Sequence, residues 1–269
     1  MRLTRGDPAD RPRDAGERSG TQAIERAVLL LRVIASAGRR GLRIADVTAA
    51  SALSQSTVSR ILASLARQGI VERDPRTRKV FVGHVVHELG LVARVRYQLP
   101  EAARTPMQWL ADRLQDTIYL SEPSGTEAVC TAREEGGYPI KALPLHVGIR
   151  RPLGVGAGGL AILAAMSDAQ ADEILTANAR RYPAYGGIDV AFLAAARSDA
   201  LERGFAVLGE KATLGMTAVG LAIRGRTGEP IGAISIAAIT SRMTPTRQSE
   251  IARMLRLQCE GIEAAMTTR

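Results

Sequence analysis

Aromatic residues are scarce in this chain, and cysteines are nearly absent. Phe, Trp and Tyr make up 3% of the 269 residues, and the 2 cysteines, Cys130 and Cys259, lie far apart. Such a pair makes neither a disulfide framework nor a C-x-x-C motif, so we expect two buried or idle thiols. No run of about 18 apolar residues occurs, so neither a membrane span nor a membrane partner is predicted. The first residues lack the apolar core of a signal peptide, which favours a cytoplasmic location.

The chain is basic, and its positive charge is unevenly distributed along the sequence. The net charge is +9, and residues 1–97 hold 18 Lys and Arg against 9 Asp and Glu, whereas residues 98–269 hold 18 of each kind. The positive excess therefore belongs to the N-terminal third, which is typical of a polyanion-binding module joined to a neutral one. With 46% hydrophobic residues, the chain can build one large or two modest domains.

The N-terminal third has the pattern of a winged helix-turn-helix. Apolar residues recur at helical spacing, and a serine N-cap and a glycine mark the two ends of the third helix. Two short strands follow it, joined by a basic turn that would form the wing. The predicted elements are helices over residues 23–37, 44–50 and 54–69, strands over residues 70–73 and 80–82, and a turn over residues 74–79.

The third predicted helix has an apolar stripe on one side and small polar residues on the other. The polar side carries Gln55, Ser56, Thr57, Ser59 and Arg60. Arg can pair with guanine and Gln with adenine, while hydroxyl groups reach bases or phosphates, so we predict that this face enters the DNA major groove. The alternative is a solvated helix face with an N-cap.

The predicted wing supplies a second basic element. Its turn carries Arg76, Arg78 and Lys79, which we expect to contact phosphates or the minor groove. The alternative is an ordinary charged turn. Because a basic surface releases counterions when it binds DNA, we expect the affinity to fall steeply with salt.

Beyond the wing, paired strands with flanking helices predict an α+β fold with a mostly antiparallel sheet. Proline should interrupt the linker helix at Pro100, and Ser167 begins a capping box. Strands are expected over residues 118–120, 128–130, 140–147, 219–223 and 231–239, and helices over residues 101–114, 154–166 and 245–266. The expected domains are a disordered tail (1–20), a winged helix-turn-helix domain (21–83), a linker helix (84–100) and an α+β domain (101–269).

Several motifs occur in a fixed order over about residues 22–266. The first group is Ile24-Glu25-Arg26-Ala27, Ser56-Thr57-Val58-Ser59-Arg60-Ile61-Leu62, Gly69-Ile70-Val71-Glu72-Arg73-Asp74 and His87-Glu88-Leu89-Gly90. The second group is Arg151-Pro152-Leu153, then Gly204-Phe205-Ala206-Val207 with Glu210 and Gly215, then Gly232-Ala233-Ile234-Ser235-Ile236 with Arg242. Together these motifs closely resemble the IclR (isocitrate lyase regulator) family.

This resemblance implies a winged helix-turn-helix followed by a GAF-like effector domain. It implies homodimers, often paired into homotetramers, that bind palindromic operators in double-stranded DNA. It also implies small-molecule effectors, among which small carboxylates and aromatic catabolites are common. We expect neither a cofactor nor a metal.

The resemblance also indicates which residues would bind the effector. The family's pocket maps onto a glycine-rich loop and two strands, with an arginine before the loop, at Arg151, Ala157, Gly158, Met216, Ala218, Ser235 and Ala237. Departures from the family pattern at Gly154, Leu160, Ala218 and Ala237 leave few polar groups. We therefore expect an effector that is bulkier and more apolar than a two- or three-carbon acid, anchored by Arg151 and Ser235. Arg151 could instead be a surface or interface arginine.

Two competing motifs carry less weight. Gly154, Gly156 and Gly159 match a dinucleotide-binding fingerprint, but no βαβ unit surrounds them. His84, His87 and Glu88 lie one helical turn apart, yet a zinc site needs three or four ligands. No nucleophile-base arrangement is evident.

The leading hypothesis is a ligand-responsive transcriptional regulator, repressor or activator, of a catabolic operon, and not an enzyme. One alternative is an enzyme or cofactor-binding protein with an appended DNA-binding domain. Another is a regulator without a small-molecule effector, which a pocket without polar groups would favour.

Overall fold

The computed structural model describes residues 17–141 and 145–267. The described residues form two compact units, the first within residues 1–92 and the second within residues 93–269. The first unit comprises α1 (Glu17–Ser36), η1 (Gly38–Arg40), α2 (Ile44–Ser51), α3 (Gln55–Arg67), β1 (Val71–Arg73), β2 (Val80–Val82) and most of α4 (His84–Arg94).

The first unit folds as a winged helix-turn-helix, as the sequence predicts. Ser54 caps α3 by accepting a hydrogen bond from the backbone N–H of Thr57, and Gly69 turns the chain after the helix with a positive φ. β1 and β2 form the antiparallel wing. Helices and wing share one apolar core that contains Leu30, Ile34, Val47, Val58, Leu62, Val71 and Val80.

The first helix begins earlier than the sequence indicates. α1 starts at Glu17, so residues 17–20 are helical and the predicted tail is too long at its C-terminal end. Once a helix is nucleated, each further residue adds one hydrogen bond, and this extends it across the polar segment. The rest of the predicted tail, residues 1–16, lies outside the described residues.

The second unit is built on one sheet with helices around it. Its helical elements are α5 (Leu99–Leu114), α6 (Ala157–Ala165), α7 (Asp168–Asn178), η2 (Tyr182–Ala184), α8 (Val190–Arg203), η3 (Thr240–Arg242) and α9 (Pro245–Thr267). Its strands are β3 (Thr117–Ser124), β4 (Glu127–Glu135), β5 (Arg150–Pro152), β6 (Ala206–Leu208), β7 (Met216–Arg224) and β8 (Pro230–Ile239).

The sheet has the order β5-β4-β3-β8-β7-β6, and the neighbouring strands pair antiparallel. Successive side chains of a strand point to opposite faces. Ile118 and Leu120 of β3 pack on one face, in the core that α5 and α9 share. Tyr119 and Ser121 belong to the other face and line a cavity. The predicted α+β class with an antiparallel sheet is confirmed.

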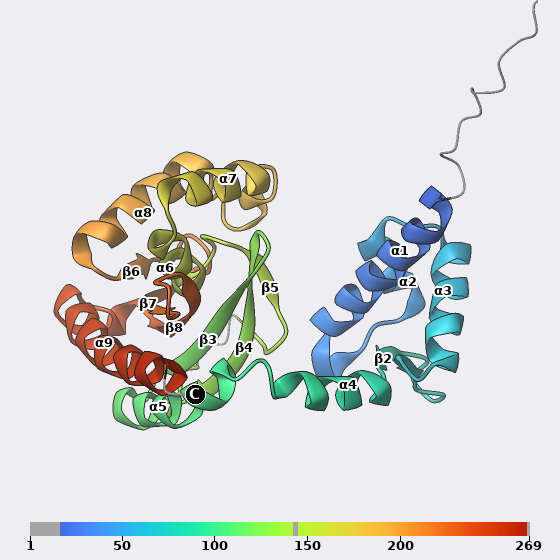
Figure 1. Cartoon of the computed structure of the whole chain (residues 1–269), viewed down its shortest axis with the longest axis horizontal. Coiled ribbons are helices and arrows are strands. Elements are labelled where there is room, and N and C mark those ends of the chain that lie inside the picture. The colour runs from blue at the N-terminus through green and yellow to red at the C-terminus, as the bar shows by residue number, and fades with distance from the viewer. Residues whose placement is uncertain (1–16, 142–144, 268–269) are drawn as a thin grey trace, which may run out of the picture. The chain divides into compact units, whose positions relative to one another are not determined.

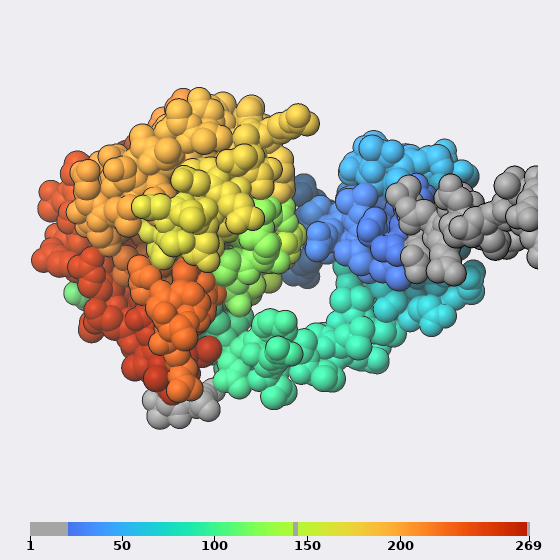
Figure 2. Space-filling view, turned by 45° about the horizontal axis from the view of Figure 1, so that its top comes forward, coloured from blue at the N-terminus to red at the C-terminus, as the bar shows by residue number. Residues whose placement is uncertain are grey.

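Helices cover both faces of this sheet. α5 and α9 pack on one face, and α6 packs on the other, with α8 and α7 behind it (Figure 1). Figure 2 shows α7 and α8, in yellow to orange, as a continuous layer on the outside of the second unit. Among the described residues, no helix is long and apolar enough to cross a membrane.

Three expectations for the second unit are wrong. Pro100 does not interrupt a helix, because it lies in the first turn of α5, where its missing N–H has no helical acceptor to lose. The described part of residues 140–147 forms no strand. Backbone hydrogen bonding with β4 begins at Gly148 and Ile149, which bond to Cys130. Helix α8 and strand β6 lie where we predicted no element.

Candidate DNA-binding and effector-binding sites

The polar face of α3 is presented to solvent. Val58 and Leu62 hold the helix in the core, whereas Gln55, Ser59 and Arg60 are exposed. Ser56 is also exposed, and the half-buried Thr57 receives a 2.8 Å hydrogen bond from the Ser54 hydroxyl on its own hydroxyl. All the predicted recognition residues therefore lie on α3, and the N-cap network engages the hydroxyl of Thr57.

The wing turn is shaped by Asp74. Its carboxylate accepts hydrogen bonds from the backbone N–H groups of Arg76 (2.8 Å) and Thr77 (3.1 Å). The bond from Thr77, followed by that from Arg76, holds the pKa of this carboxyl below its usual value. Arg78 takes a left-handed conformation with φ 58°. The turn thus exposes Arg76 and Arg78, while the Lys79 ammonium donates to the backbone oxygen of Arg40 at 2.8 Å.

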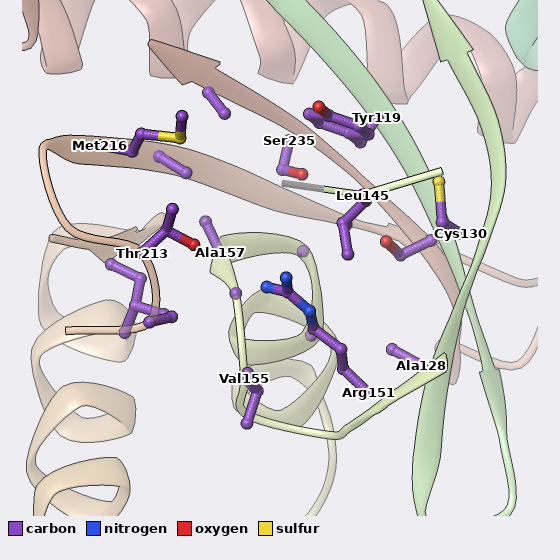
Figure 3. A pocket seen from close by; sticks show the side chains of 18 of the residues that line it. Tyr119, Ala128, Cys130, Leu145, Arg151, Val155, Ala157, Thr213, Met216 and Ser235 are labelled. Atoms are coloured by element: carbon purple, nitrogen blue, oxygen red, sulfur yellow. The ribbon is translucent and has the colours of Figure 1, made fainter. Parts of the chain in front are cut away.

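The second unit contains a cavity between the sheet and the N-terminal end of α6 (Figure 3). Its empty volume is about 640 Å³, including space open to solvent, which suits a small-molecule ligand. The structure brings all the predicted effector residues to the wall of this one cavity: Arg151, Ala157, Gly158, Met216, Ala218, Ser235 and Ala237.

The first turn of α6 forms part of the cavity wall. Its N-cap is Gly156 with φ 88°, and no side chain caps the helix within the described residues. Gly158 lies so close to the sheet that an added Cβ would be 3.1 Å from Ser121 Oγ and 3.2 Å from Ser235 Oγ. Backbone N–H groups at a helix N-terminus attract anions. This wall therefore combines two hydroxyl groups with a site of partial positive charge.

Arg151 is a charged residue at the wall of the cavity. It extends from β5 into the pocket (Figure 3), and its guanidinium carbon lies 6.0 Å from the centre of the Tyr185 ring. Burial lowers its pKa from the ordinary value, and the neighbouring Tyr185, Tyr119 and Cys130 act against this effect. Because an arginine stays protonated at physiological pH, the cavity holds a partly desolvated positive charge.

Sequence reasoning missed several lining residues. Tyr119, Ser121 and Cys130 come from β3 and β4, and the apolar Leu145 and Val155 come from loops. Alternation along β3 places Tyr119 and Ser121 on one face, but it does not say which face holds the cavity. Burial raises the pKa of the Cys130 thiol to about 11, so this thiol is not an activated nucleophile.

Neither competing motif builds the site that it suggested. Gly154 and Gly156, with φ 96° and 88°, follow an antiparallel edge strand, so the glycines shape the cavity loop and do not belong to a βαβ unit. His84 pairs with Glu88 at 3.0 Å on an exposed helix face. Within the described residues, no group of three or more His, Cys, Asp or Glu could hold a metal ion.

A winged helix-turn-helix followed by a ligand-sized cavity in a second unit defines a DNA-binding transcriptional regulator of the two-part type. Comparison with protein families gives the same answer for each part. Residues 23–75 match the IclR helix-turn-helix domain, and residues 93–264 match the bacterial transcriptional regulator IclR C-terminal domain. The chain belongs to the IclR family of transcriptional regulators.

Curated relatives are similar over nearly the whole chain. The HTH-type transcriptional regulator BhcR of Paracoccus denitrificans is 28% identical over 250 residues, which cover 91% of this chain and 88% of BhcR. The HTH-type transcriptional repressor AllR of Salmonella typhimurium is 25% identical over 248 residues, which cover 92% of this chain and 90% of AllR. The shared length includes both units.

Solved structures share the fold. A regulator of this family from Alicyclobacillus acidocaldarius has a TM-score of 0.75 at 18% identity, covering 91% of this chain and 98% of its own. An IclR homologue from Microbacterium hydrocarbonoxydans, solved in complex with 4-hydroxybenzoate, has a TM-score of 0.73 at 23% identity, covering 92% and 100%.

Proposed function

We propose that this regulator changes its hold on DNA when a small carboxylate with an apolar body binds in the cavity of the second unit. The observation that carries the proposal is the place of Arg151. It is the charged side chain among the described residues that line the cavity, and it is partly buried there. A partly desolvated positive charge at the wall of a ligand-sized cavity favours an anionic ligand.

The anion has a second set of donors within the same cavity. The backbone N–H groups at the start of α6 and the hydroxyls of Ser121 and Ser235 line the wall near Gly158. A carboxylate has two oxygens and can accept several hydrogen bonds at once. We propose that Arg151 and Ser235 anchor the carboxylate, with Ala157 and Gly158 supplying backbone donors.

The rest of the wall is apolar and would contact the body of the effector. Leu145, Val155, Met216, Ala218 and Ala237 contribute to it. Glyoxylate or pyruvate would leave this apolar surface without contacts, whereas an aromatic ring would cover it. The Microbacterium homologue was solved with 4-hydroxybenzoate, which supports an aromatic or similarly bulky carboxylate as the effector here.

The cavity also bears on the two alternatives. A regulator without an effector would favour a pocket without polar groups, but this pocket contains a guanidinium, a phenol and hydroxyls. The enzyme alternative gains no support from Cys130 or Tyr119, because burial raises the pKa values of the Cys130 thiol and the Tyr119 phenol and so activates neither group. We therefore propose that the ligand is bound and released without being converted.

On the DNA side, we propose that α3 reads the major groove through Gln55, Ser56, Thr57, Ser59 and Arg60. We assign Arg76, Arg78 and Lys79 to the backbone or minor groove. We propose that DNA is bound in the cytoplasm by a domain that covers residues 21–83. Residues 84–100 form the linker, in which the predicted helix is shorter than expected and ends at Arg94, and the effector-binding domain covers residues 101–269.

A palindromic operator requires two copies of this unit. Large apolar side chains are exposed along α1 and α4, with Ile24 at 67%, Leu89 at 60% and Val92 at 76% exposure in the single chain. A second chain that packs on these helices would bury them. We propose a homodimer through α1 and α4, which a further contact could pair into a tetramer.

The effector can act only if it binds the DNA-competent and DNA-incompetent arrangements with different affinity. We propose that the controlled genes form an operon for catabolism of the same acid. Isothermal calorimetry of the full-length protein with 4-hydroxybenzoate, benzoate, pyruvate and glyoxylate tests the ligand class. We expect the aromatic acids to bind more tightly. Tight binding of the two- and three-carbon acids alone would contradict this assignment.

The DNA assignment has its own test. A DNA site selected from a random duplex library provides the operator. We expect Arg60→Ala to lower the affinity of the protein for this operator. The ratio of operator affinity to random-DNA affinity should also fall, since each good base contact contributes about 1–3 kcal/mol of discrimination. Unchanged operator binding by Arg60→Ala would contradict the role of α3.

A further inference from the structure

The turn between α1 and α2 forms a β-bridge with wing strand β2 and so lies beside the two-stranded wing as a third segment. Leu42 and Val80 form an antiparallel bridge through two hydrogen bonds, Leu42 N–H to Val80 O at 3.1 Å and Val80 N–H to Leu42 O at 2.7 Å. Gly41 lies against the ring of Phe81, where an added Cβ would come within 2.5 Å of the ring carbons. Residues 38–43, here called the third edge, are therefore fixed to β2.

The third edge is strongly basic. Arg39 and Arg40 end η1, and Arg43 precedes α2. All three are exposed, and no ion pair joins them to another residue within the part of the chain that the structure describes. A cluster of exposed arginines without acidic partners on one edge of a DNA-binding unit has the charge pattern of a phosphate contact.

The acidic groups nearby are already engaged. The carboxylate of Asp46 accepts a 3.1 Å hydrogen bond from the backbone N–H of Arg43. The carboxylate of Asp74 accepts from the wing backbone, as described above. Both carboxylates thus accept hydrogen bonds from backbone N–H groups. Within the described residues, neither carboxylate forms an ion pair with an arginine side chain. The guanidinium groups of the third edge therefore keep their donors for an outside anion.

Lys79 ties the third edge to the wing turn. Its ammonium donates to the backbone oxygen of Arg40 at 2.8 Å, so the lysine spans from the wing to η1. This contact fixes the distance between the wing arginines and those of the third edge. It also uses one of the three donors of Lys79, which makes this lysine a positioning residue as well as a charge.

We propose that the third edge is a second DNA-backbone contact of this unit, in which Arg40 and Arg43 bind phosphates beside those bound by the wing. The proposal rests on DNA binding by the first unit and extends it to residues that neither the helix-turn-helix pattern nor the wing includes. Because phosphates are the same at every base pair, these contacts strengthen binding without contributing to sequence choice.

The test compares Arg40→Gln/Arg43→Gln with Arg253→Gln in the full-length protein. Arg253 is exposed on α9, so the control variant removes one positive charge from the second unit. Both substitutions on the third edge keep the backbone atoms that bond to Lys79 and Asp46. Fluorescence anisotropy measures the affinity for a selected operator and for a random duplex between 50 and 200 mM salt, and circular dichroism checks folding.

The double variant should bind both duplexes more weakly by the same factor. The slope of log affinity against log salt should become shallower by about 3.6 for the homodimer, since two arginines are lost from each of two chains and each lost phosphate contact removes about 0.9. Arg40→Gln alone should remove about half of this change, and Arg253→Gln should leave the slope as in the wild type.

Three results would overturn the proposal. The first is an unchanged salt slope in a folded double variant. The second is a loss confined to the operator, because that result indicates base reading. The third is a wild-type protein that binds neither duplex. That result would also contradict DNA binding by the first unit, so it can be distinguished from a failure of the third edge alone.

Discussion

Tyr119 of β3 lies directly opposite Ser235 of β8, and both residues line the cavity. On the other side of β8, Ser235 is opposite Gly220 of β7. An added Cβ on Gly220 would come within 2.4 Å of the backbone oxygen of Ala157. Three neighbouring strands thus present a phenol, a hydroxyl and bare backbone beneath the first turn of α6. The backbone fixes much of the cavity's shape, so few side chains determine its specificity.

Arg151→Gln should weaken the binding of a carboxylate effector. It removes the charge but keeps a shorter side chain that can still hydrogen-bond, and charge-assisted hydrogen bonds contribute about 1.5–3 kcal/mol. We therefore expect roughly a 10- to 150-fold loss in affinity by calorimetry. Arg151→Lys should lose less because it retains the charge.

The controls for Arg151 separate charge from general disturbance. Arg253→Gln changes an exposed arginine of α9, and its effector affinity should equal that of the wild type. The amide analogue of the effector, which lacks the negative charge, should bind wild type and Arg151→Gln alike. Equal carboxylate affinity in Arg151→Gln and wild type would show that Arg151 is not the anchor.

Gly158→Ala should disturb the contact between α6 and the sheet. The new methyl group would lie 3.1–3.2 Å from the hydroxyl oxygens of Ser121 and Ser235, so these groups or the helix must move. Overpacking of this kind costs about 1–3 kcal/mol. We expect lower stability in urea unfolding and weaker effector binding. The control is Gly261→Ala on α9, where nothing lies within 4 Å of an added Cβ, and this variant should be as stable as the wild type or more stable. Equal stability and equal effector affinity in the two variants would contradict the close contact at Gly158.

Stability should depend on pH through Glu127. Burial raises the pKa of this carboxyl, but hydrogen bonds from Arg181 and Arg150, the latter at 2.6 Å, outweigh burial and hold the pKa below its usual value. A lowered pKa in the folded state means that the charged form stabilises the protein above the unfolded pKa. This contribution is lost as the pH falls through the folded pKa.

Glu127→Gln should therefore destabilise the protein at pH 7. The destabilisation should shrink progressively as the pH falls below about 4.3, the unfolded pKa, and disappear only below the lower folded pKa. The expected loss at pH 7 is on the order of 2 kcal/mol for hydrogen bonds to a charged group. Urea unfolding over this pH range measures it. A difference between variant and wild type that does not shrink at low pH would contradict the pairing.

Val92→Glu should separate the proposed dimer. Val92 is 76% exposed in the single chain, and a charge buried in an apolar interface is costly. Sedimentation velocity should show a smaller species for Val92→Glu than for the wild type. Thr176→Glu, which adds the same charge at an exposed position of α7, should sediment as the wild type does. An unchanged assembly in Val92→Glu would place the interface elsewhere.

The winged unit was predictable because its signals are local. Ser54 as N-cap, the apolar spacing from Val58 to Leu62 and the stop at Gly69 all act within α3. The segment over residues 140–147 shows the limit of such signals. It is rich in apolar residues and was expected to form a strand, but the backbone bonds to Cys130 of β4 at Gly148 and Ile149. Strand formation depends on which partner edge is available, and one segment does not contain that information.

The cavity was predictable in part for a similar reason. The resemblance to the IclR family pointed to residues such as Arg151 and Ser235, which the structure brings to one wall. Tyr119 and Cys130 come from β3 and β4, which pair only in the folded sheet. Likewise, the third edge of the wing exists only because Leu42 pairs with Val80 across many intervening residues. Long-range pairing therefore supplies what local pattern cannot.

The central claim is that a carboxylate in the cavity controls DNA binding by the first unit. Its most direct test is operator affinity, measured by anisotropy at fixed salt with and without saturating 4-hydroxybenzoate or the tightest acid found by calorimetry. We predict that the acid changes the operator affinity of the wild type by about 5- to 150-fold, the usual range of coupling between sites, and leaves that of Arg151→Gln unchanged at the same concentration. An acid that binds the wild type without changing its operator affinity would contradict the account.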